Sequence, residues 1–420
     1  MDILNDKEVC SLSNKLQEKA AQGGYVVSDL LLEHNGQKLQ LVDLVMEGGG
    51  TLGIALVGYV YALEKAGIRF LSIGGSSVGA IVSLLLACSR PRTQEKGDLL
   101  TEFIAKMDMS SFIDGGFFGN TLSRLLGSGK IKDKKWQIAL TGLLCIRTVC
   151  KKIGLNPGNQ FQNWLAQCLA DCDVHTLADA MKVISNIPEG ITHRLHKDNY
   201  SPPQATLKIV AADITTGSKI VFPEMAALYW ENPETINPAL FARASMSIPG
   251  FFQPMEVTGV ANIVNSTENW RDLCSFKGSI PDKITFSDGG LLSNFPISLF
   301  HENRVPNVPT LGARLGSNSR VVNEIRTIGA YSRGVLASLR HYSDYDFIYH
   351  NPDYRNLITY IPTAGHNWLN FYMDDAEKLT LFKKGMIAAH AFLESFDWLG
   401  YKEIRRAKLK YEQASLATTV

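Results

Sequence analysis

Two strand–turn–helix patterns follow one another in the first quarter of the chain, and they restrict its possible folds more than any other feature. Residues 39–45 (LQLVDLV) form a short apolar run that ends in a glycine cluster, and residues 54–67 continue with apolar positions at helical spacing. Residues 68–73 (IRFLSI) then read as a second buried strand, and residues 80–88 (AIVSLLLAC) as a second apolar helix. Consecutive units of this kind imply parallel strands joined by a right-handed crossover, so both turns should lie at the same carboxyl edge of one sheet.

The rest of the chain extends this start into an α/β domain. Residues from about 90 to 203 show helical patterns without a clear strand, which predicts a helical insertion. Further strands are predicted at 207–213, 219–222, 283–286 and 310–316. We therefore expect three segments: a helical lead-in at 1–38, one catalytic domain at 39–320 that carries the insertion at about 90–203, and a helical region at 321–420 packed on that domain.

Composition narrows the class of protein. The 420 residues carry 42 basic and 41 acidic side chains, a net charge of +1, and 45% of them are hydrophobic. A disordered chain needs lower hydrophobicity and higher net charge, and a dedicated nucleic-acid binder needs a concentrated basic surface. The acidic, polar start MDILNDKEVC does not resemble a secretory signal, and no apolar run reaches the roughly 18 residues of a membrane span. Seven cysteines without paired spacing favour reduced thiols, so we expect a cytoplasmic protein without nucleic-acid partners.

The second glycine turn has the pattern of a nucleophile elbow. Gly75-x-Ser77-x-Gly79 stands between a predicted strand and a predicted helix, and only Ser77 has glycine two residues away on both sides. In such an elbow the tight turn strains the serine backbone and exposes its Oγ, while the small flanking residues let strand and helix approach. A structural glycine turn is the plain alternative, but the strand and helix on either side favour Ser77 as a nucleophile.

The first glycine turn has two interpretations. Gly48-x-Gly50-x-x-Gly53 satisfies the dinucleotide-binding fingerprint, which also requires an acidic residue at the end of the next strand. Residues 66–94 contain no acidic residue, and Ser77 stands where the ribose anchor would be. The other interpretation is that N–H groups of Gly48, Gly49 and Gly50 form an oxyanion hole beside the nucleophile. A nucleotide-binding module therefore stays the weaker alternative.

The base that would activate Ser77 is not settled by spacing. Eight histidines lie downstream, none in a distinctive motif, although His350 and His366 stand in loop-like sequence; an esterase of the α/β-hydrolase type would use one of them. Asp288 ends a predicted strand and precedes two glycines, which makes a carboxylate base the other option. Asp114 also precedes two glycines, but it has no strand before it and reads as a turn residue.

Five ordered motifs, taken together, resemble the patatin-like phospholipases. They are Glu47 with its glycine turn, the Ser77 elbow, Ala212-Asp213 followed by TTGSKIVF, the run from Ala244 to Pro249 (ASMSIP), and Asp288-Gly289-Gly290 followed by Asn294-Phe295-Pro296. The resemblance covers about residues 41–315, and the helix around 378–396 is similar in character.

The resemblance implies a fold, a reaction and its residues. The fold would be a three-layer α/β sandwich with a mostly parallel sheet. The reaction would be hydrolysis of fatty-acyl esters of phospholipids or related lipids by a Ser77–Asp288 dyad, with N–H groups of Gly49 and Gly50 as oxyanion donors and no metal or other cofactor. Leu52 stands where the family often has a basic residue, so no headgroup preference is carried over.

The insertion also carries a candidate membrane contact. Basic residues bracket an apolar stretch with Trp136, a composition that suits an interfacial segment on anionic lipid, although a solvated cap helix fits equally well. The basic residues are Lys130, Lys132, Lys134, Lys135, Arg147, Lys151 and Lys152. We expect a peripheral protein at a phospholipid surface, and a gate in the insertion that responds to an activating ligand, a protein partner or homo-oligomerisation.

Overall fold

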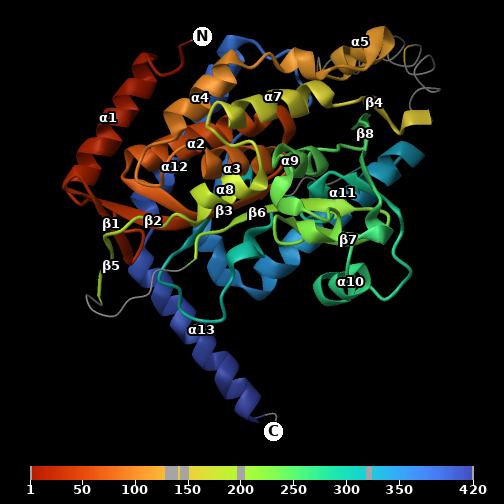
Figure 1. Cartoon of the computed structure of the whole chain (residues 1–420). Helices are drawn as coiled ribbons and strands as arrows, with labels where there is room; N and C mark the ends of the chain where they lie inside the picture. Colours follow the sequence, from red (N-terminus) through yellow and green to blue (C-terminus); the bar gives the residue numbers. More distant parts are fainter. Residues whose placement is uncertain (1, 128–140, 142–150, 196–203, 318–323, 419–420) are drawn as a thin grey trace.

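The protein is described here by a computed structural model of the 420-residue chain. The structure describes residues 2–127, 141, 151–195, 204–317 and 324–418. A mixed sheet runs through the middle of the molecule, with helices packed on its faces (Figure 1). The predicted α/β class with a mostly parallel central sheet is confirmed.

In the described part of the chain, ten strands form the main sheet. Its central path has the order β12-β11-β2-β3-β6-β10-β9, in which β12, β11, β2, β3 and β6 are parallel neighbours and β10 and β9 are antiparallel. The bounds are β1 (Leu30–His34), β2 (Gln37–Met46), β3 (Ile68–Ser76), β5 (Ile191–His193), β6 (Leu207–Asp213), β7 (Ser218–Phe222), β9 (Met255–Thr258), β10 (Lys283–Ser287), β11 (Thr310–Leu315) and β12 (Ile358–Ile361). A separate pair joins β4 (Gly154–Asn156) and β8 (Gly250–Phe252).

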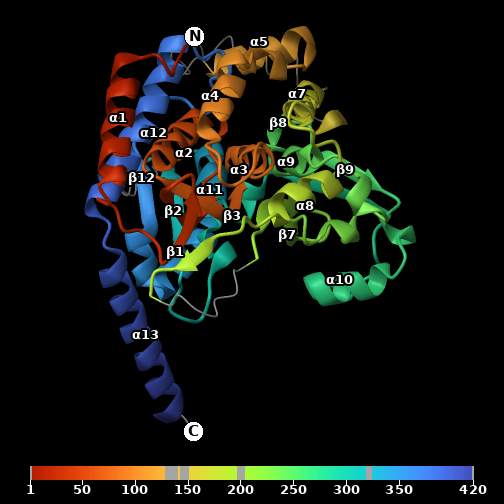
Figure 2. The same ribbon diagram turned by 60° about the vertical axis from the view of Figure 1, so that its left-hand side comes forward.

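Helices cover the sheet, and one of them extends beyond it. The described helices are α1 (Lys7–Ala21), α2 (Gly53–Lys65), α3 (Val78–Cys88), α4 (Gly97–Lys106), α5 (Gly116–Gly127), α7 (Asn159–Ala170), α8 (Leu177–Ser185), α9 (Ala239–Ser245), α10 (Ser266–Cys274), α11 (Ile328–His350), α12 (Asp375–Ser395) and α13 (Trp398–Thr418). Helices α2, α3, α9 and α12 pack together on one face, whereas α13 projects away from the body (Figures 1 and 2).

The six strands predicted from sequence are all present, and the two strand–turn–helix units are confirmed. The predicted run 39–45 lies in β2 and 68–73 lies in β3, and these two strands are parallel neighbours. Their side chains are buried on both faces of the sheet, which explains why nearly every residue in these runs is apolar. The carboxyl ends of β2 and β3 therefore lie side by side, with Met46 opposite Gly75.

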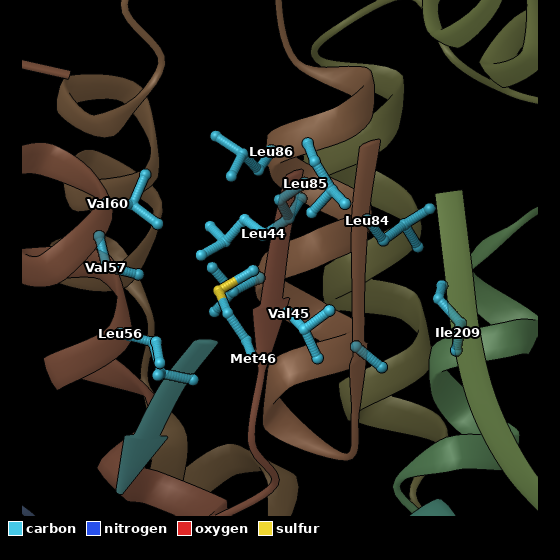
Figure 3. Close-up of a cluster of buried hydrophobic side chains, with 14 of the residues drawn as sticks. Leu44, Val45, Met46, Leu56, Val57, Val60, Leu84, Leu85, Leu86 and Ile209 are labelled. Atoms are coloured by element: carbon cyan, nitrogen blue, oxygen red, sulfur yellow. The ribbon is translucent and has the colours of Figure 1, made fainter. Parts of the chain in front are cut away.

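The core lies between β2 and the helices that cover it. Side chains from β2, such as Leu44, meet side chains from α2, such as Val57, and from α3, such as Leu85 (Figure 3). Helices α2 and α12 approach closely enough for their backbones to touch. A Cβ on Gly58 would lie 2.0 Å from the carbonyl oxygen of Phe382, and one on Gly385 would lie 1.9 Å from that of Ala55. Glycine at both positions is what permits this contact.

Three segments that were predicted to be helical also contain strands. The lead-in contains α1 but also β1, which pairs with β2. The insertion contains two strands of three residues each, β4 and β5. The C-terminal region adds β12, which pairs with β11 in the main sheet. All these strands are short, and a run of three to five residues is too brief to show a reliable period.

Candidate active site

Ser77 stands at a strained turn between β3 and α3. Its backbone has φ +52° and ψ −122°, a conformation that L-residues rarely adopt and that costs about 1–3 kcal/mol. The flanking glycines allow the elbow to form. A Cβ on Gly79 would lie 2.3 Å from the carbonyl oxygen of Met46, and one on Gly75 would lie 2.6 Å from the carbonyl carbon of Gly79. The two glycines predicted to permit close packing at the elbow therefore lie in backbone contact.

The backbone of Ser77 is held by Ser245, a residue at the end of α9. The Ser77 N–H donates to Ser245 Oγ at 2.8 Å, and the Ser245 hydroxyl donates to the carbonyl oxygen of Val210 in β6 at 2.6 Å. Ser245 is fully buried, so each of these polar groups depends on the other for its hydrogen bond. The strained elbow is thus tied to the neighbouring strand.

Asp288 meets Ser77 from the other side of β6. It follows β10 and begins the short helix η6 (Gly289–Leu291), whose Gly290 N–H donates to Asp288 Oδ1 at 2.8 Å. The other carboxylate oxygen, Oδ2, accepts from Ser77 Oγ at 2.6 Å. The Asp288 N–H donates to the carbonyl oxygen of Ser247 at 2.9 Å, which fixes the backbone as well. Both side chains are buried, with 3% exposure for Ser77 and 6% for Asp288.

The first glycine turn lies against Ser77. A Cβ on Gly48 would lie 3.0 Å from the Cβ of Ser77. The Gly48 N–H donates to the carbonyl oxygen of Asn294 at 2.9 Å, and the Asn294 side-chain amide donates back to the carbonyl oxygen of Gly48 at 3.1 Å. Gly48 is therefore not a free donor, which corrects the prediction that its N–H contributes to an oxyanion hole.

Gly49 and Gly50 are the donors that remain in this turn. Gly49 is extended at φ −176°, whereas Gly50 has φ +55°, the left-handed region that favours glycine. Within the described residues, neither N–H has a hydrogen-bond acceptor. The turn opens the short helix η1 (Gly50–Leu52), so both groups lie at a helix N-terminus, where a developing negative charge is stabilised.

Glu47 anchors the turn to β11 and to the loop after Asp288. One of its carboxylate oxygens accepts from Leu315 N at 2.6 Å, and the other accepts from Arg314 Nε at 3.2 Å and from the Asn294 amide at 3.3 Å. Burial raises the pKa of the Glu47 carboxyl to about 7, and the Arg314 guanidinium acts in the opposite direction. The Arg314 cation also lies over the Phe295 ring, 5.5 Å from its centroid.

The segment after β12 holds the other side of the turn. The Thr51 N–H donates to the carbonyl oxygen of Trp368 at 2.9 Å. A Cβ on Gly50 would lie 2.2 Å from the same carbonyl oxygen. The glycine turn is thus enclosed by backbone from residues 367–368 on one side and by Asn294 on the other.

An apolar cavity, partly open to solvent, begins beside these turns. Gly50 of the first glycine turn and Val78, which follows Ser77, line one part of it. Leu85 also lines it, and lies about 10 Å further along α3 at 1.5 Å per residue. The remaining lining residues are Thr51, Gly53, Ile54, Val57, Ile81, Val82, Leu100, Ile104, Met107, Met109, Phe112, Phe161, Trp164, Met246, Ile248 and Phe371.

The histidines do not form a triad with Ser77 among the side chains that the structure describes. His301 contacts the Tyr354 hydroxyl and Asn303, and His350 contacts Asp346, which precedes it by one turn of α11. Burial lowers the pKa of His366, which lies in the segment after β12. None of these imidazoles is bonded to the Ser77 hydroxyl, whose bond goes to Asp288.

The other predicted residues lie elsewhere. Asp114 accepts from the N–H groups of Gly158, Asn159 and Gln160 and so caps α7, a long-range contact that its interpretation as a turn residue did not include. Of the basic residues in the candidate membrane segment, Lys151 and Lys152 are exposed, and the others lie outside the described residues, as does Trp136. No described helix is both long and apolar enough to cross a bilayer, and the described residues contain no group of three metal-ligating side chains.

The same region of the chain matches a family of known proteins. The family model for patatin-like phospholipase matches residues 44–301, more than half of the chain. The chain belongs to the patatin-like phospholipase family. Both glycine turns, Ser77 and Asp288 fall within the matched residues.

Relatives of the patatin-like chain differ in how much of it they share. An uncharacterized protein of Bacillus subtilis, YqhO, is 26% identical over 362 residues, which cover 85% of this chain and 99% of that protein. The neuropathy target esterase sws of Drosophila melanogaster is 25% identical over 173 residues, or 37% of this chain and 12% of that protein. The lysophospholipase nte1 of Aspergillus niger is 52% identical over 46 residues, 11% of this chain and 3% of that protein.

Two solved structures resemble the patatin-like chain at low sequence identity. VipD from Legionella pneumophila has a TM-score of 0.42 and 16% identity, covering 91% of this chain and 73% of VipD. ExoU from Pseudomonas aeruginosa, solved in complex with SpcU, has a TM-score of 0.36 and 18% identity, covering 84% of this chain and 52% of that chain.

Sequence reasoning did not assign a role to several residues that hold the site. Ser245 and Asn294 belong to motifs that carried the resemblance, but their contacts with Ser77 and Gly48 link positions far apart in the chain. Arg314 lies in a strand that was predicted only as apolar text. The one sign of a special role in the sequence was a charged residue, Arg314, within an otherwise apolar strand.

Proposed function

We propose that the protein is a lipid acyl hydrolase of phospholipase A or lysophospholipase type, which cleaves fatty-acyl esters through a Ser77–Asp288 dyad. The observation that carries the proposal is the 2.6 Å hydrogen bond from Ser77 Oγ to Asp288 Oδ2 next to the apolar cavity. Family membership supports ester hydrolysis, and two relatives are named as an esterase and a lysophospholipase.

The mechanism begins with proton transfer from Ser77 to Asp288. Because Gly290 occupies Oδ1, the second carboxylate oxygen is directed at the serine hydroxyl. As the proton moves to Oδ2, Ser77 Oγ attacks the ester carbonyl, and the N–H groups of Gly49 and Gly50 stabilise the negative oxygen of the tetrahedral intermediate. Collapse of the intermediate expels the alcohol, which takes the proton back from Asp288 and leaves an acyl-serine.

The second half of the reaction uses the same groups in the same roles. Asp288 removes a proton from water, and the water oxygen attacks the acyl carbonyl. The oxyanion is again held by the Gly49 and Gly50 N–H groups, and its collapse releases the fatty acid and returns the proton to Ser77. The cavity lined by Val78 and Leu85 would hold the acyl chain during both steps.

The test compares variants on a fluorophosphonate probe, a short-chain ester and lipid vesicles. Ser77→Ala should abolish labelling and hydrolysis, and Asp288→Asn should lower both by at least about 10²-fold, the lower end of the range for loss of a general base. Asp114→Asn is the matched control, since Asp114 also precedes two glycines but caps α7 instead. Wild-type activity of Asp288→Asn, together with loss of activity on replacing a histidine such as His366, would show that the triad alternative is correct.

Location and regulation are part of the same proposal. The protein would act as a peripheral enzyme at a phospholipid surface, with its activity gated by a ligand, a protein partner or self-association. Mass spectrometry of products from mixed-lipid vesicles would identify the preferred ester. Activity on a short-chain ester before and after adding cell extract would test the gate, because a gated enzyme gains activity and an ungated one does not.

A further inference from the structure

The loop between β12 and α12, residues 362–374, contains Trp368, Phe371 and Tyr372, whose side chains have different surroundings. We call this segment the aromatic loop. Phe371 is buried, lines the apolar cavity and stacks on Phe251 with the ring centroids 5.0 Å apart. Trp368 and Tyr372 are partly exposed, at 39% and 41%. One short loop therefore contributes both to the wall of the cavity and to the surface outside it.

Strand pairing places the aromatic loop at the catalytic edge of the sheet. The last residue of β12, Ile361, lies opposite Leu315 of β11 in a parallel pair. β11 is in turn parallel to β2, with Ala313 opposite Met46 just before the glycine turn. The loop therefore leaves the sheet at the edge where the glycine turn and the Ser77 elbow lie. The bond from the Thr51 N–H to the Trp368 carbonyl oxygen fastens it there.

The chemistry around Tyr372 is that of a membrane–water interface. Trp and Tyr concentrate at such interfaces, because their rings are apolar and their polar atoms remain hydrated. The Arg124 guanidinium on α5 lies over the Tyr372 ring, 5.3 Å from its centroid. Asp374 and Asp375, two and three residues after Tyr372, are exposed, so charges of both signs lie near Tyr372. Charges of both signs beside an exposed aromatic ring fit a zwitterionic lipid better than an anionic one.

We propose that Trp368 and Tyr372 dock the protein on the interface of a zwitterionic phospholipid bilayer, with the mouth of the apolar cavity turned towards the lipid. The inference rests on the proposed function, because a lipid hydrolase must take its acyl chain from the bilayer. Phe371 links the two surfaces: the loop that enters the lipid headgroups also forms the wall along which the chain passes.

The size of the effect follows from the exposed fractions. Aromatic side chains bury about 150–250 Å² each when covered, so exposure near 40% leaves roughly 60–100 Å² per ring to be buried by lipid. At about 25 cal/mol per Å², the two rings together correspond to at least a tenfold change in partitioning. Full burial of both rings would correspond to about 100-fold, so the double variant Trp368→Ala/Tyr372→Ala should bind phosphatidylcholine vesicles at least about tenfold more weakly even if lipid covers only half of the exposed area.

Binding is best measured in a Ser77→Ala background, so that no lipid is consumed. Vesicle co-sedimentation and quenching of tryptophan fluorescence by brominated phosphatidylcholine report docking without any catalytic step. Tyr411→Ala is the matched control, since Tyr411 is 77% exposed but lies on α13, which projects away from the body (Figures 1 and 2). Trp368→Phe keeps an apolar ring and should retain most of the binding, and thermal melts establish that each variant is folded.

The expected pattern is weaker binding for the loop variants, wild-type binding for Tyr411→Ala, and brominated-lipid quenching that disappears with Trp368→Phe. Equal binding of the double variant and the control overturns the inference. Binding that requires anionic vesicles and ignores the loop also overturns it and points to the basic segment around Lys151 and Lys152. Failure of the proposed function is a separate result: the loop would still dock, but no ester would be cleaved by the protein with Ser77 intact.

Discussion

Removing the Ser245 hydroxyl tests how much the hydrogen bond that holds the Ser77 backbone matters, because the Ser77 side chain itself is left unchanged. The Ser245→Ala variant leaves the Ser77 N–H without its acceptor and the Val210 carbonyl oxygen without the donor that lies 2.6 Å away. Both groups are buried, and an unsatisfied buried polar group costs about 1–3 kcal/mol. We expect a loss of about 2 kcal/mol in the free energy of unfolding.

We expect Ser245→Ala to impair activity more severely than stability, because activity depends on the exact position of Ser77 Oγ. Ser77 is held at φ +52°, and this strain of about 1–3 kcal/mol is maintained by its surroundings. Without the Ser245 bond the elbow can relax, and displacement of Oγ from the carbonyl of the ester reduces the rate steeply. We expect labelling of Ser77 by a fluorophosphonate to slow by about 10- to 100-fold.

Ser83→Ala is the matched control for this experiment. Ser83 is a fully buried serine on α3, six residues after Ser77, and its hydroxyl has no hydrogen-bond partner within the part of the chain that the structure describes. Removing an unpaired hydroxyl should leave stability unchanged or raise it slightly. Urea denaturation and labelling rates measured side by side decide the matter: if Ser245→Ala equals Ser83→Ala in both, the argument for a held elbow is refuted.

Three further perturbations test the glycine turn, the cavity and the buried acid. Gly50→Ala should abolish activity because its Cβ would meet the Trp368 carbonyl oxygen at 2.2 Å, whereas Gly217→Ala, also at positive φ but in open space, should cost only about 1 kcal/mol of stability and no activity. Val82→Phe should narrow the cavity and shift preference from long to short acyl esters, measured as the ratio of kcat/KM values; an unchanged ratio contradicts the cavity's role. For Glu47, a pKa raised from 4.5 to about 7 means that the folded state binds more protons between these values, so stability falls by up to about 3 kcal/mol as pH rises through that window. Urea titrations of wild type and Glu47→Gln at pH 5 and pH 8 measure this as a difference, and equal pH dependence of the two proteins contradicts it.

The parts of the fold that sequence predicted well are those with a strong local pattern. β2 and β3 are buried on both faces, so their sequences are nearly continuous runs of apolar residues. A glycine turn follows each run and leads into an apolar helix. β12 was not predicted because its four residues, Ile358–Ile361, show no period, and because its place in the sheet depends on pairing with β11. β1 was missed for a similar reason: it pairs with its neighbour in sequence, β2, but its five residues are too few to show a clear period.

The site was predictable in its residues and unpredictable in its contacts. Ser77 and Gly48–Gly50 could be predicted from the spacing of the glycines around them. Asp288 lies 211 positions from Ser77 in the sequence and was chosen because of the family resemblance. Spacing also gave no sign that the Gly48 N–H would be taken by Asn294, a contact made only when the two loops meet at the edge of the sheet. The catalytic roles of Ser77 and Asp288 remain predictions until the variants are measured.

The contacts also explain why distant strands should matter for the chemistry. The donor turn is bonded to β11 through Glu47 and to the segment after β12 through Thr51, while the nucleophile is bonded to α9 through Ser245. Because an oxyanion donor stabilises charge only when its position is fixed before the reaction, we expect the β11–β12 side of the sheet to contribute to the rate without touching substrate. Cutting the Arg314 contact with Arg314→Leu should therefore lower the rate constant for labelling more than it lowers affinity for the probe. A change in affinity alone would mean that Glu47 and Arg314 only stabilise the fold.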